Sequence, residues 1–364
     1  SAQERTRAAS YLAIKYGIQL DAASEPNYLA SDGTVIWNGS ARAGYTSGII
    51  GIGGDASSGL NQKQSHSSLG IDILSLGLGS VEASNNNNSG NFGVDKSFLL
   101  VGNNGALTGS VTTTDLPLNP GTATPMRMRL ARVWQAQNTN SVGALALQFD
   151  LTGAFSNTVA YQASDLVLLI DHNTGNFTTT TISGGAASAT AMGGNVYRFS
   201  GITLTTGDRF TVGLVKKAQR LDLNPPYALL VDQSLTITAA PLYSINSATV
   251  TYSLLAGSGS ATINSNGFLQ ATGAGTLTLV AATTATADYT SATTSTLISI
   301  GKATPSLQLV APLALTVGSV SNVITVTTAG TISGGSTSNG GVVTFSIAAP
   351  GAGLSATVNS STGQ

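Results

Sequence analysis

The stretch Leu145-Ala146-Leu147-Gln148-Phe149-Asp150-Leu151 alternates between large apolar residues and small or polar ones. Successive side chains of a β-strand point to opposite faces of its sheet, so this alternation predicts a strand that is buried on one side only. Residues 166–170 are apolar throughout, which favours a central strand, and Phe210, Val212 and Leu214 alternate again. These segments together predict an antiparallel β-sandwich.

A single helix is expected ahead of the first strand, over about residues 3–16. Apolar positions 8, 11, 12 and 16 recur at the three-to-four spacing of one helix face, and Gly17 is a natural C-terminal stop. A lysine pair at 216–217, followed by Asn224-Pro225-Pro226, marks the end of this region. We therefore place a first domain, a β-sandwich with one N-terminal helix, at residues 1–216.

The rest of the chain repeats itself. Val250-Thr251-Tyr252-Ser253-Leu254 is echoed by Val343-Thr344-Phe345-Ser346-Ile347, and a Lys-Ala segment at Lys217 is echoed at Lys302. The spacings are 93 and 85 residues, which is too long for a solenoid unit and typical of tandem β-sandwich domains. The expected fold is therefore all-β: an antiparallel β-sandwich with one N-terminal helix, followed by immunoglobulin-like repeats at 217–301 and 302–364.

The second repeat is incomplete, because nothing after it matches the strand at 276–280. We expect the chain to be a piece of a longer repetitive protein. The open edge of the last sandwich would then be completed either within the same chain or by a neighbouring copy.

Composition excludes several classes of partner. Charged residues make up 9% of the 364 residues, where about 25% is usual. The 15 Lys and Arg against 16 Asp and Glu give a net charge of −1, so we expect no nucleic-acid partner. Apolar runs have strand length, far short of the roughly 20 residues of a membrane helix, so no membrane span is expected. The chain has no cysteine, which rules out disulfides and thiolate metal sites.

One candidate metal site lies in the segment Asp171-His172-Asn173-Thr174-Gly175-Asn176. The oxygen-bearing side chains of Asp171, Asn173 and Asn176 surround a glycine, as in short loops that bind Ca²⁺, although the distal Glu of an EF-hand loop is missing. The same side chains also stabilise tight turns by bonding their own backbone. Both interpretations fit, and the turn between two strands is favoured.

One candidate ligand site involves a tryptophan. Arg127, Arg129 and Arg132 crowd one strand beside Trp134, and alternation places Arg132 and Trp134 on a face of their own. Arg132 and Trp134 could form a platform for a glycan or a carboxylate, provided that Trp134 or Trp37 is exposed. The alternative, which we favour, is a solvated strand face with one core Trp.

Signals for catalysis or nucleotide binding are weak. Glycines at 51, 53 and 54 imitate a dinucleotide fingerprint, but no convincing helix follows, so a turn or bulge between strands is expected. His66 and His172 are the only histidines, neither has a recognisable base context, and the sequence has no Gly-x-Ser-x-Gly elbow. We therefore expect a protein that is not an enzyme and that needs no cofactor, apart from the candidate Ca²⁺.

Several stretches of the first domain resemble one family. They are Tyr11-Leu12-Ala13-Ile14-Lys15-Tyr16-Gly17-Ile18, Ala30-Ser31-Asp32-Gly33-Thr34-Val35-Ile36-Trp37, Ile50-Gly51-Ile52-Gly53, Leu60-Asn61-Gln62-Lys63-Gln64-Ser65 and Arg129-Leu130-Ala131-Arg132-Val133-Trp134. In this order they look like a β-rich module of large surface proteins from Bacteroidetes and relatives. Residues 217–364 look like the bacterial immunoglobulin-like repeats of giant adhesins. The combination resembles a cell-surface adhesin of the gliding-motility type, exported by the type IX secretion system.

The resemblance implies a function. We expect a non-enzymatic adhesin or stalk segment on the surface of a Gram-negative bacterium, with surface polysaccharide, other adhesin components or copies of itself as partners. Two alternatives stay open. One is a subunit of an extracellular fibre that is completed by strand donation, and the other is a carbohydrate-binding module of a secreted enzyme.

Overall fold

The computed structural model describes residues 1–21, 26–68, 70, 72–117, 124–155, 160–172, 175–179, 189–242, 249–302, 306–310 and 325–329. The chain divides into two compact units, Ser1–Ala218 with Thr286–Thr290, and Gln219–Ala285 with Ser291–Gln364. The expected boundary after residue 216 lies close to the first of these breaks. The expected boundary at residue 302 stays a prediction, because most of the residues beyond it lie outside the described part.

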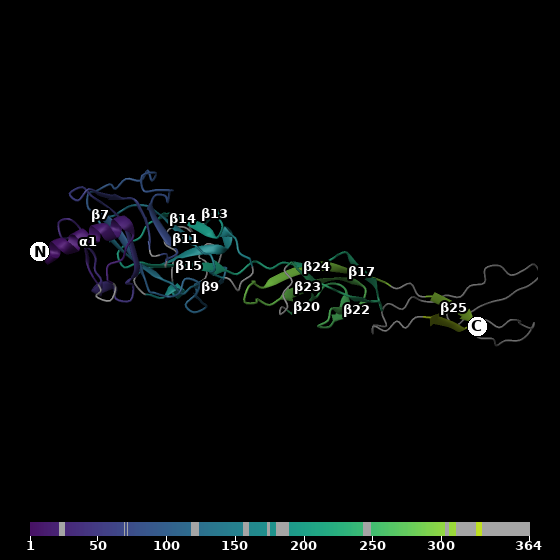
Figure 1. Ribbon diagram of the computed structural model, residues 1–364. Helices are drawn as coiled ribbons and strands as arrows, with labels where there is room; N and C mark the ends of the chain where they lie inside the picture. The colour runs from purple at the N-terminus through teal and green to yellow at the C-terminus, as the bar shows by residue number, and fades with distance from the viewer. Residues whose placement is uncertain are drawn as a thin grey trace, which may run out of the picture. The chain divides into compact units, whose positions relative to one another are not determined.

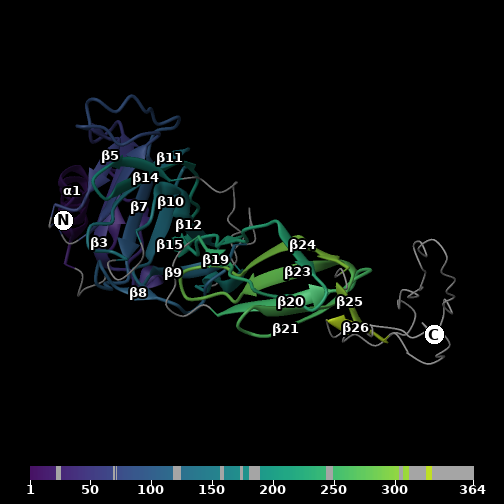
Figure 2. The ribbon, with the colours of Figure 1, turned by 90° about the vertical axis from the view of Figure 1, so that its right-hand side faces the viewer.

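The first unit is built on two facing sheets (Figure 1). The larger sheet has the order β4-β3-β7-β10-β15-β9-β8, and a further strand, β12, pairs with β15. Its strands are β3 (Ser47–Asp55), β4 (Leu60–Gln62), β7 (Ser97–Asn103), β8 (Val111–Thr112), β9 (Met126–Leu130), β10 (Trp134–Thr139), β12 (Leu166–Asp171) and β15 (Arg209–Val215). Neighbouring strands β3, β7, β10 and β15 can be followed across Figure 2.

The smaller sheet has five strands in the order β13-β14-β11-β6-β5. They are β5 (Gln64–His66), β6 (Leu74–Leu78), β11 (Leu145–Asp150), β13 (Thr190–Gly193) and β14 (Val196–Ile202). Neighbouring strands in both sheets run antiparallel. The predicted antiparallel β-sandwich is confirmed.

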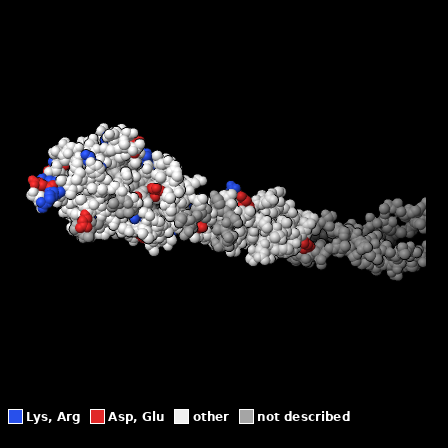
Figure 3. Space-filling model, viewed as in Figure 1, with Lys and Arg blue, Asp and Glu red and all other residues white. Residues whose placement is uncertain are grey.

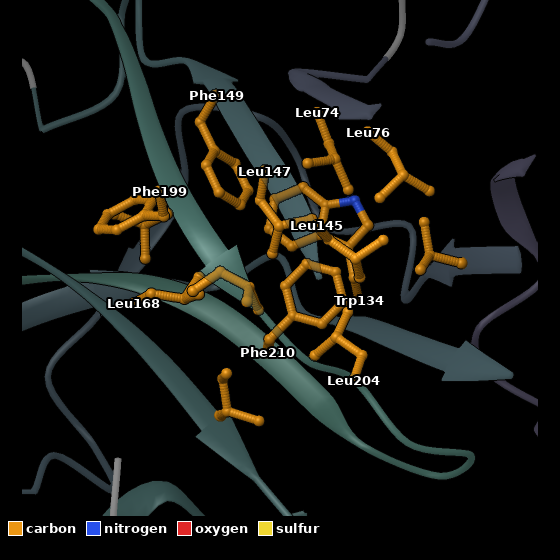
Figure 4. Packing of buried hydrophobic residues seen from close by; sticks show 14 of the residues in the cluster. Leu74, Leu76, Trp134, Leu145, Leu147, Phe149, Leu168, Phe199, Leu204 and Phe210 are labelled. Atoms are coloured by element: carbon orange, nitrogen blue, oxygen red, sulfur yellow. The ribbon is translucent and has the colours of Figure 1, made fainter. Parts of the chain in front are cut away.

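A large apolar core fills the space between the two sheets (Figure 4). Trp134 stacks on Phe210 with ring centroids 5.8 Å apart and meets Phe149 edge-on at 5.3 Å. Phe149 in turn meets Phe199 edge-on at 5.9 Å. Because each such pair adds about 0.5–1.5 kcal/mol beyond its buried area, this row of rings is a major source of stability for the first unit.

The outer face of the larger sheet is covered as well. Helix α1 (Ala2–Tyr16) and the hairpin of β1 (Tyr28–Leu29) and β2 (Val35–Trp37) pack on β3 and β7 through a second apolar cluster. A third cluster around Leu169 and Phe177 covers β12 and β15. The larger sheet is thus the middle layer, and β7 and β12 are buried along their whole length.

This middle position corrects two details of the strand predictions. Strand β12 is apolar because both faces of its sheet are covered, and not because it is central: among the described strands it pairs with β15 alone. Strand β11 is buried on both sides over Leu145, Ala146 and Leu147, and alternates only toward Asp150, which is exposed. A continuous apolar run therefore indicates that both faces of the strand are buried. It does not indicate whether the strand is central or at the edge of its sheet.

The glycine-rich segment at 51–54 is also different from expectation. It lies inside strand β3 and is not a turn between strands. A Cβ on Gly53 would collide with the ring of Phe98 on the neighbouring strand β7. Glycine is needed here because the aromatic side chain lies directly on the backbone.

Helix α1 confirms the predicted helix. The side chain of Ser1 caps its first turn by accepting a hydrogen bond from the Glu4 N–H at 3.3 Å. Gly17 ends the helix with φ 62° and ψ 30°, the left-handed conformation that a glycine adopts without strain. The Ser10 hydroxyl accepts a 2.9 Å hydrogen bond from the Leu29 N–H, which ties the helix to β1.

The second unit contains a sandwich with fewer strands. One sheet has the order β17-β24-β23-β20, and the other has the order β18-β22-β21. The strands are β17 (Tyr227–Leu230), β18 (Ser234–Thr236), β20 (Val250–Leu255), β21 (Ser260–Ile263), β22 (Phe268–Gly273), β23 (Gly275–Thr283) and β24 (Ala292–Gly301). Burial alternates residue by residue along β20, β23 and β24, so each strand contributes one face to a core of small and aliphatic side chains.

Two short strand pairs complete the description. In the second unit, β16 (Leu221–Asp222) pairs with β19 (Ala240–Pro241), and β25 (Ser306–Val310) pairs with β26 (Thr325–Ala329). Strand β17 runs parallel to β24, whereas the other pairs of this unit are antiparallel. Within the described part of the chain, every helix is too short or too polar to span a bilayer.

Candidate functional site

One surface depression of the first unit lies where the chain passes from one sheet to the other. Strand β4 is an edge of the larger sheet, β5 is an edge of the smaller sheet, and Lys63 alone separates them. Two adjoining hollows of about 290 and 280 Å³ lie along β5 and share the lining residues Gln64, Ser65, His66 and Ala83. We call them together the β5 groove, whose main lining residues are Lys15, Tyr16, Gln62, Gln64, His66 and Glu82.

The end of helix α1 forms one wall of the β5 groove. The carbonyl oxygen of Gly17 accepts hydrogen bonds from the backbone N–H and the hydroxyl of Ser68, both at 3.0 Å. A Cβ on Gly17 would collide with the carbonyl oxygen of His66. Glycine thus lets the helix end lie directly against β5, which brings Tyr16 to the groove.

Side-chain amides fix the opposite wall. The Gln64 amide donates to the Glu82 carbonyl at 2.9 Å and accepts from the Glu82 N–H at 2.8 Å, as a second strand would. Asn85 accepts from the Lys63 N–H at 2.6 Å and donates to the Asn61 carbonyl at 2.9 Å. The loop between β6 and β7, which contains Glu82 and Asn85, is therefore held in place by paired amide hydrogen bonds before any ligand arrives.

Other groups in the β5 groove face solvent. The Tyr16 side chain is 58% exposed. The His66 ring and the Glu82 carboxylate are exposed and have no hydrogen-bond partner among the described residues. A tyrosine offers an apolar ring face and a polar tip, while the imidazole and carboxylate supply hydrogen bonds. This combination suits a ligand with apolar C–H faces and many hydroxyls.

Lys15 adds a positive charge beside the ring. Its ammonium donates a 2.9 Å hydrogen bond to the Tyr11 hydroxyl and lies 5.8 Å from the centroid of the Tyr16 ring. The hydrogen bond to Tyr11 raises the pKa of Lys15 above its ordinary value. Lys15 lines one of the two hollows and Glu82 lines the other, so the groove as a whole carries one cationic and one anionic side chain, and its net charge is close to zero.

Arg132 and Trp134 lie together, but they are not at the surface. The Arg132 Nη1 lies 3.2 Å from Oδ1 of Asp72, and the Trp134 Nε1 donates to Oδ2 at 3.1 Å. Asn103 also donates to Oδ2, at 3.1 Å, and the Asp72 side chain is fully buried. Trp134 and Trp37 are both 0% exposed, so the exposed ring that the predicted sugar platform requires is missing. Arg132 and Trp134 belong to an internal cluster because a buried carboxylate compensates the guanidinium.

The candidate Ca²⁺ loop is described only in part, because Asn173 lies outside the described residues. Asp171 is buried and accepts a hydrogen bond from the Gly175 N–H, and Asn176 accepts from the Thr178 N–H at 2.8 Å. Hydrogen bonds of this kind, from an Asp or Asn side chain to a nearby backbone N–H, are the ones expected if the segment is a tight turn. The Ca²⁺ site at Asp171, Asn173 and Asn176 stays a prediction.

One polar pair was not expected from the sequence. Nδ1 of His172 lies 2.7 Å from Oδ1 of the buried Asp208, which also binds the backbone N–H and the hydroxyl of Thr205 at 2.7 and 2.9 Å. Asp171 pairs with Arg209 in the antiparallel register of β12 and β15. The residue after Asp171 therefore faces the residue before Arg209, and these two residues are His172 and Asp208. The pair fastens the end of β12 to the turn before β15. Only the strand register could have revealed it.

Charged side chains are sparse on the surface as well. Figure 3 shows a face that is almost wholly uncharged, apart from a small group at the start of α1 and a few isolated residues. Contacts of such a surface depend little on ionic strength.

Comparison with known proteins gives a match to a family model. The model of a family described as a domain of unknown function (DUF8202) matches residues 4–208, which is more than half of the chain. No curated protein matches the chain.

Proposed function

We propose that this chain, which belongs to the DUF8202 family, is a non-enzymatic segment of a cell-surface adhesin that holds neutral polysaccharide in the β5 groove. In this proposal the first unit binds and the second unit is part of a stalk. The setting is the surface of a Gram-negative bacterium of the gliding type, with export by type IX secretion, as the family resemblance of the sequence implies.

The β5 groove is the observation that supports this proposal most. An exposed tyrosine ring at one wall can pack against the apolar face of a sugar, and the His66 and Glu82 side chains can bond its hydroxyls. The near-zero net charge of the groove favours a neutral sugar over a charged one. Because the walls are already held by the Gln64 and Asn85 amides, little ordering free energy opposes binding.

The second unit supports the role of a spacer. Its outward-facing positions on β24 include Thr293, Ser295 and Ser299, which are exposed hydroxyl side chains. Its inward positions Ile298 and Ile300 are buried in the apolar core. The apolar core of this sandwich holds its shape with little help from ion pairs, as a stalk exposed to varying salt requires.

The test is a calorimetric titration of the whole chain with a panel of soluble neutral glucans, mannans and galactans. We expect saturable binding of at least one of them, and about a 10-fold loss of affinity in Tyr16→Ala, which removes the ring. Leu12→Ala is the matched control, since Leu12 is 44% exposed on the same helix but does not line the groove. Equal affinities of wild type and Tyr16→Ala would contradict the groove as the site.

A further inference from the structure

A second cavity lies beneath helix α1, against the stretch from Arg7 to Ile14. It has a volume of about 360 Å³ and shares no lining residue with the β5 groove. Its floor is apolar and comes from four elements, with Ile14 on α1, Ile36 on β2, Leu60 on β4 and Phe98 on β7, all of them buried. We call this cavity the α1 pocket.

The rim of the α1 pocket is polar and includes two charged residues, Arg7 and Asp55. Asp55 is already satisfied: its Oδ2 accepts from the Ser31 N–H at 2.9 Å, and its Oδ1 accepts from the Ser31 hydroxyl at 2.8 Å. Asp55 is also almost inaccessible, with 2% exposure. Its carboxylate therefore has little capacity left to bind a ligand.

Arg7 is in the opposite situation. Its Nε is buried and has no hydrogen-bond partner among the described residues. A buried donor without a partner is costly, and guanidinium donors form a fixed fork that matches the two oxygens of a carboxylate. The unsatisfied polar group at this cavity is thus a cationic donor, which favours an anion.

We propose that the α1 pocket binds a small organic acid, with its apolar body on the floor and its carboxylate on Arg7. Mostly apolar walls with one oriented polar group are typical of small-molecule sites, and the volume lies near the lower end of their range. A monocarboxylate with one ring or a short branched chain fits both features. The proposal does not depend on polysaccharide binding, since the two sites have different residues.

The first test uses phenylacetate as the probe, titrated into the whole chain and followed by NMR line broadening and calorimetry. Phenylacetamide has the same shape without the charge, and acetate has the charge without the ring. Because the site needs both features, we expect phenylacetate to bind at least about 10-fold more tightly than either. Equal weak binding of all three would overturn the proposal.

Two variants locate the site. Arg7→Gln should lower the affinity for phenylacetate about 10-fold or more, whereas Arg5→Gln, which removes a cation from the same helix outside the pocket, should leave it unchanged. Ala8→Leu keeps a strong helix former and adds side-chain atoms at the pocket wall, so binding should be lost. A circular dichroism melt shows whether each variant is folded. Folded Arg7→Gln and Ala8→Leu proteins that bind as wild type would refute the assignment.

Discussion

The two units build β-sandwiches from the same uncharged composition but stabilise them differently. In the first unit, aromatic rings fill the core, the larger sheet is covered on both faces, and four aspartates, including Asp72 and Asp208, have buried side chains. Within the described part of the second unit, the buried apolar cluster consists of eight small and aliphatic residues, and the buried polar residues are Gln219 and Thr283.

The difference teaches where a site can be built. Buried carboxylates hold loops and strand ends at fixed positions, as Asp72, Asp55 and Asp208 do, but each must be fully compensated. The unit with this network also has the β5 groove and the α1 pocket. The unit without it has regular alternating strands, which suffice for a spacer.

The largest effect should come from removing the central carboxylate of the first unit. Asp72→Ala leaves the buried Arg132 and Trp134 donors without their acceptor, so the free energy of unfolding of this unit should fall by about 3–5 kcal/mol. Both tryptophans, Trp37 and Trp134, lie in the first unit, so tryptophan fluorescence during denaturation reports on it selectively. A loss below about 1 kcal/mol would show that the cluster contributes little.

The matching change in the second unit is Leu279→Ala. Leu279 is fully buried, and truncation should cost about 2–4 kcal/mol through lost burial and a cavity. Circular dichroism should show the destabilised transition, while the tryptophan fluorescence midpoint stays in place. The control Leu297→Ala, at a side chain that is 63% exposed, should change stability by less than about 0.5 kcal/mol. A shift of the fluorescence midpoint in Leu279→Ala would mean that the units unfold together.

A smaller effect is expected at the end of α1. Gly17→Ala introduces a Cβ into a left-handed conformation and against the His66 carbonyl, at a cost of about 1–2 kcal/mol. Because Gly17 places Tyr16 at the β5 groove, polysaccharide affinity should fall as well, as calorimetry can measure. Unchanged stability together with unchanged affinity would argue against this role of the helix end.

The smallest effect concerns pH. Burial raises the pKa of Tyr28 to about 12, because the phenolate is disfavoured in the apolar cluster under α1. The unfolded chain ionises near pH 10, so stability from this group is complete below that pH and falls as the pH rises toward 12. Between pH 9 and pH 11, wild type should lose about 1 kcal/mol relative to Tyr28→Phe. Denaturation curves of wild type and Tyr28→Phe at the two pH values measure this loss. If the difference in unfolding free energy between the two proteins were the same at both pH values, the prediction would be wrong.

The sequence predicted features that depend on local patterns. Alternation over 145–151 and the apolar run at 166–170 predicted the sandwich, and Gly17 predicted the end of the helix. These succeed because the pleat of a strand and the conformation of a cap are set by a few neighbouring residues.

The predictions that failed concern residues whose partners are distant in the sequence. Asp72 lies 60 residues before Arg132, so nothing near Trp134 indicated that it was buried on a carboxylate. Gln62, Gln64 and His66 alternate and could have been assigned to one strand face. Their meeting with Tyr16 depends on the passage of the chain between the sheets at Lys63, which no local pattern encodes.

The central claim, that the β5 groove of the first unit binds neutral polysaccharide, is tested most directly by electrophoresis in native gels that contain the polysaccharide. Wild type, Leu12→Ala and Tyr16→Phe should be retarded to a similar degree, and Tyr16→Ala should migrate as in a gel without polysaccharide, because the ring and not its hydroxyl carries most of the contact. Retardation of Tyr16→Ala equal to that of wild type, or no retardation of wild type in any neutral polysaccharide, would contradict the account.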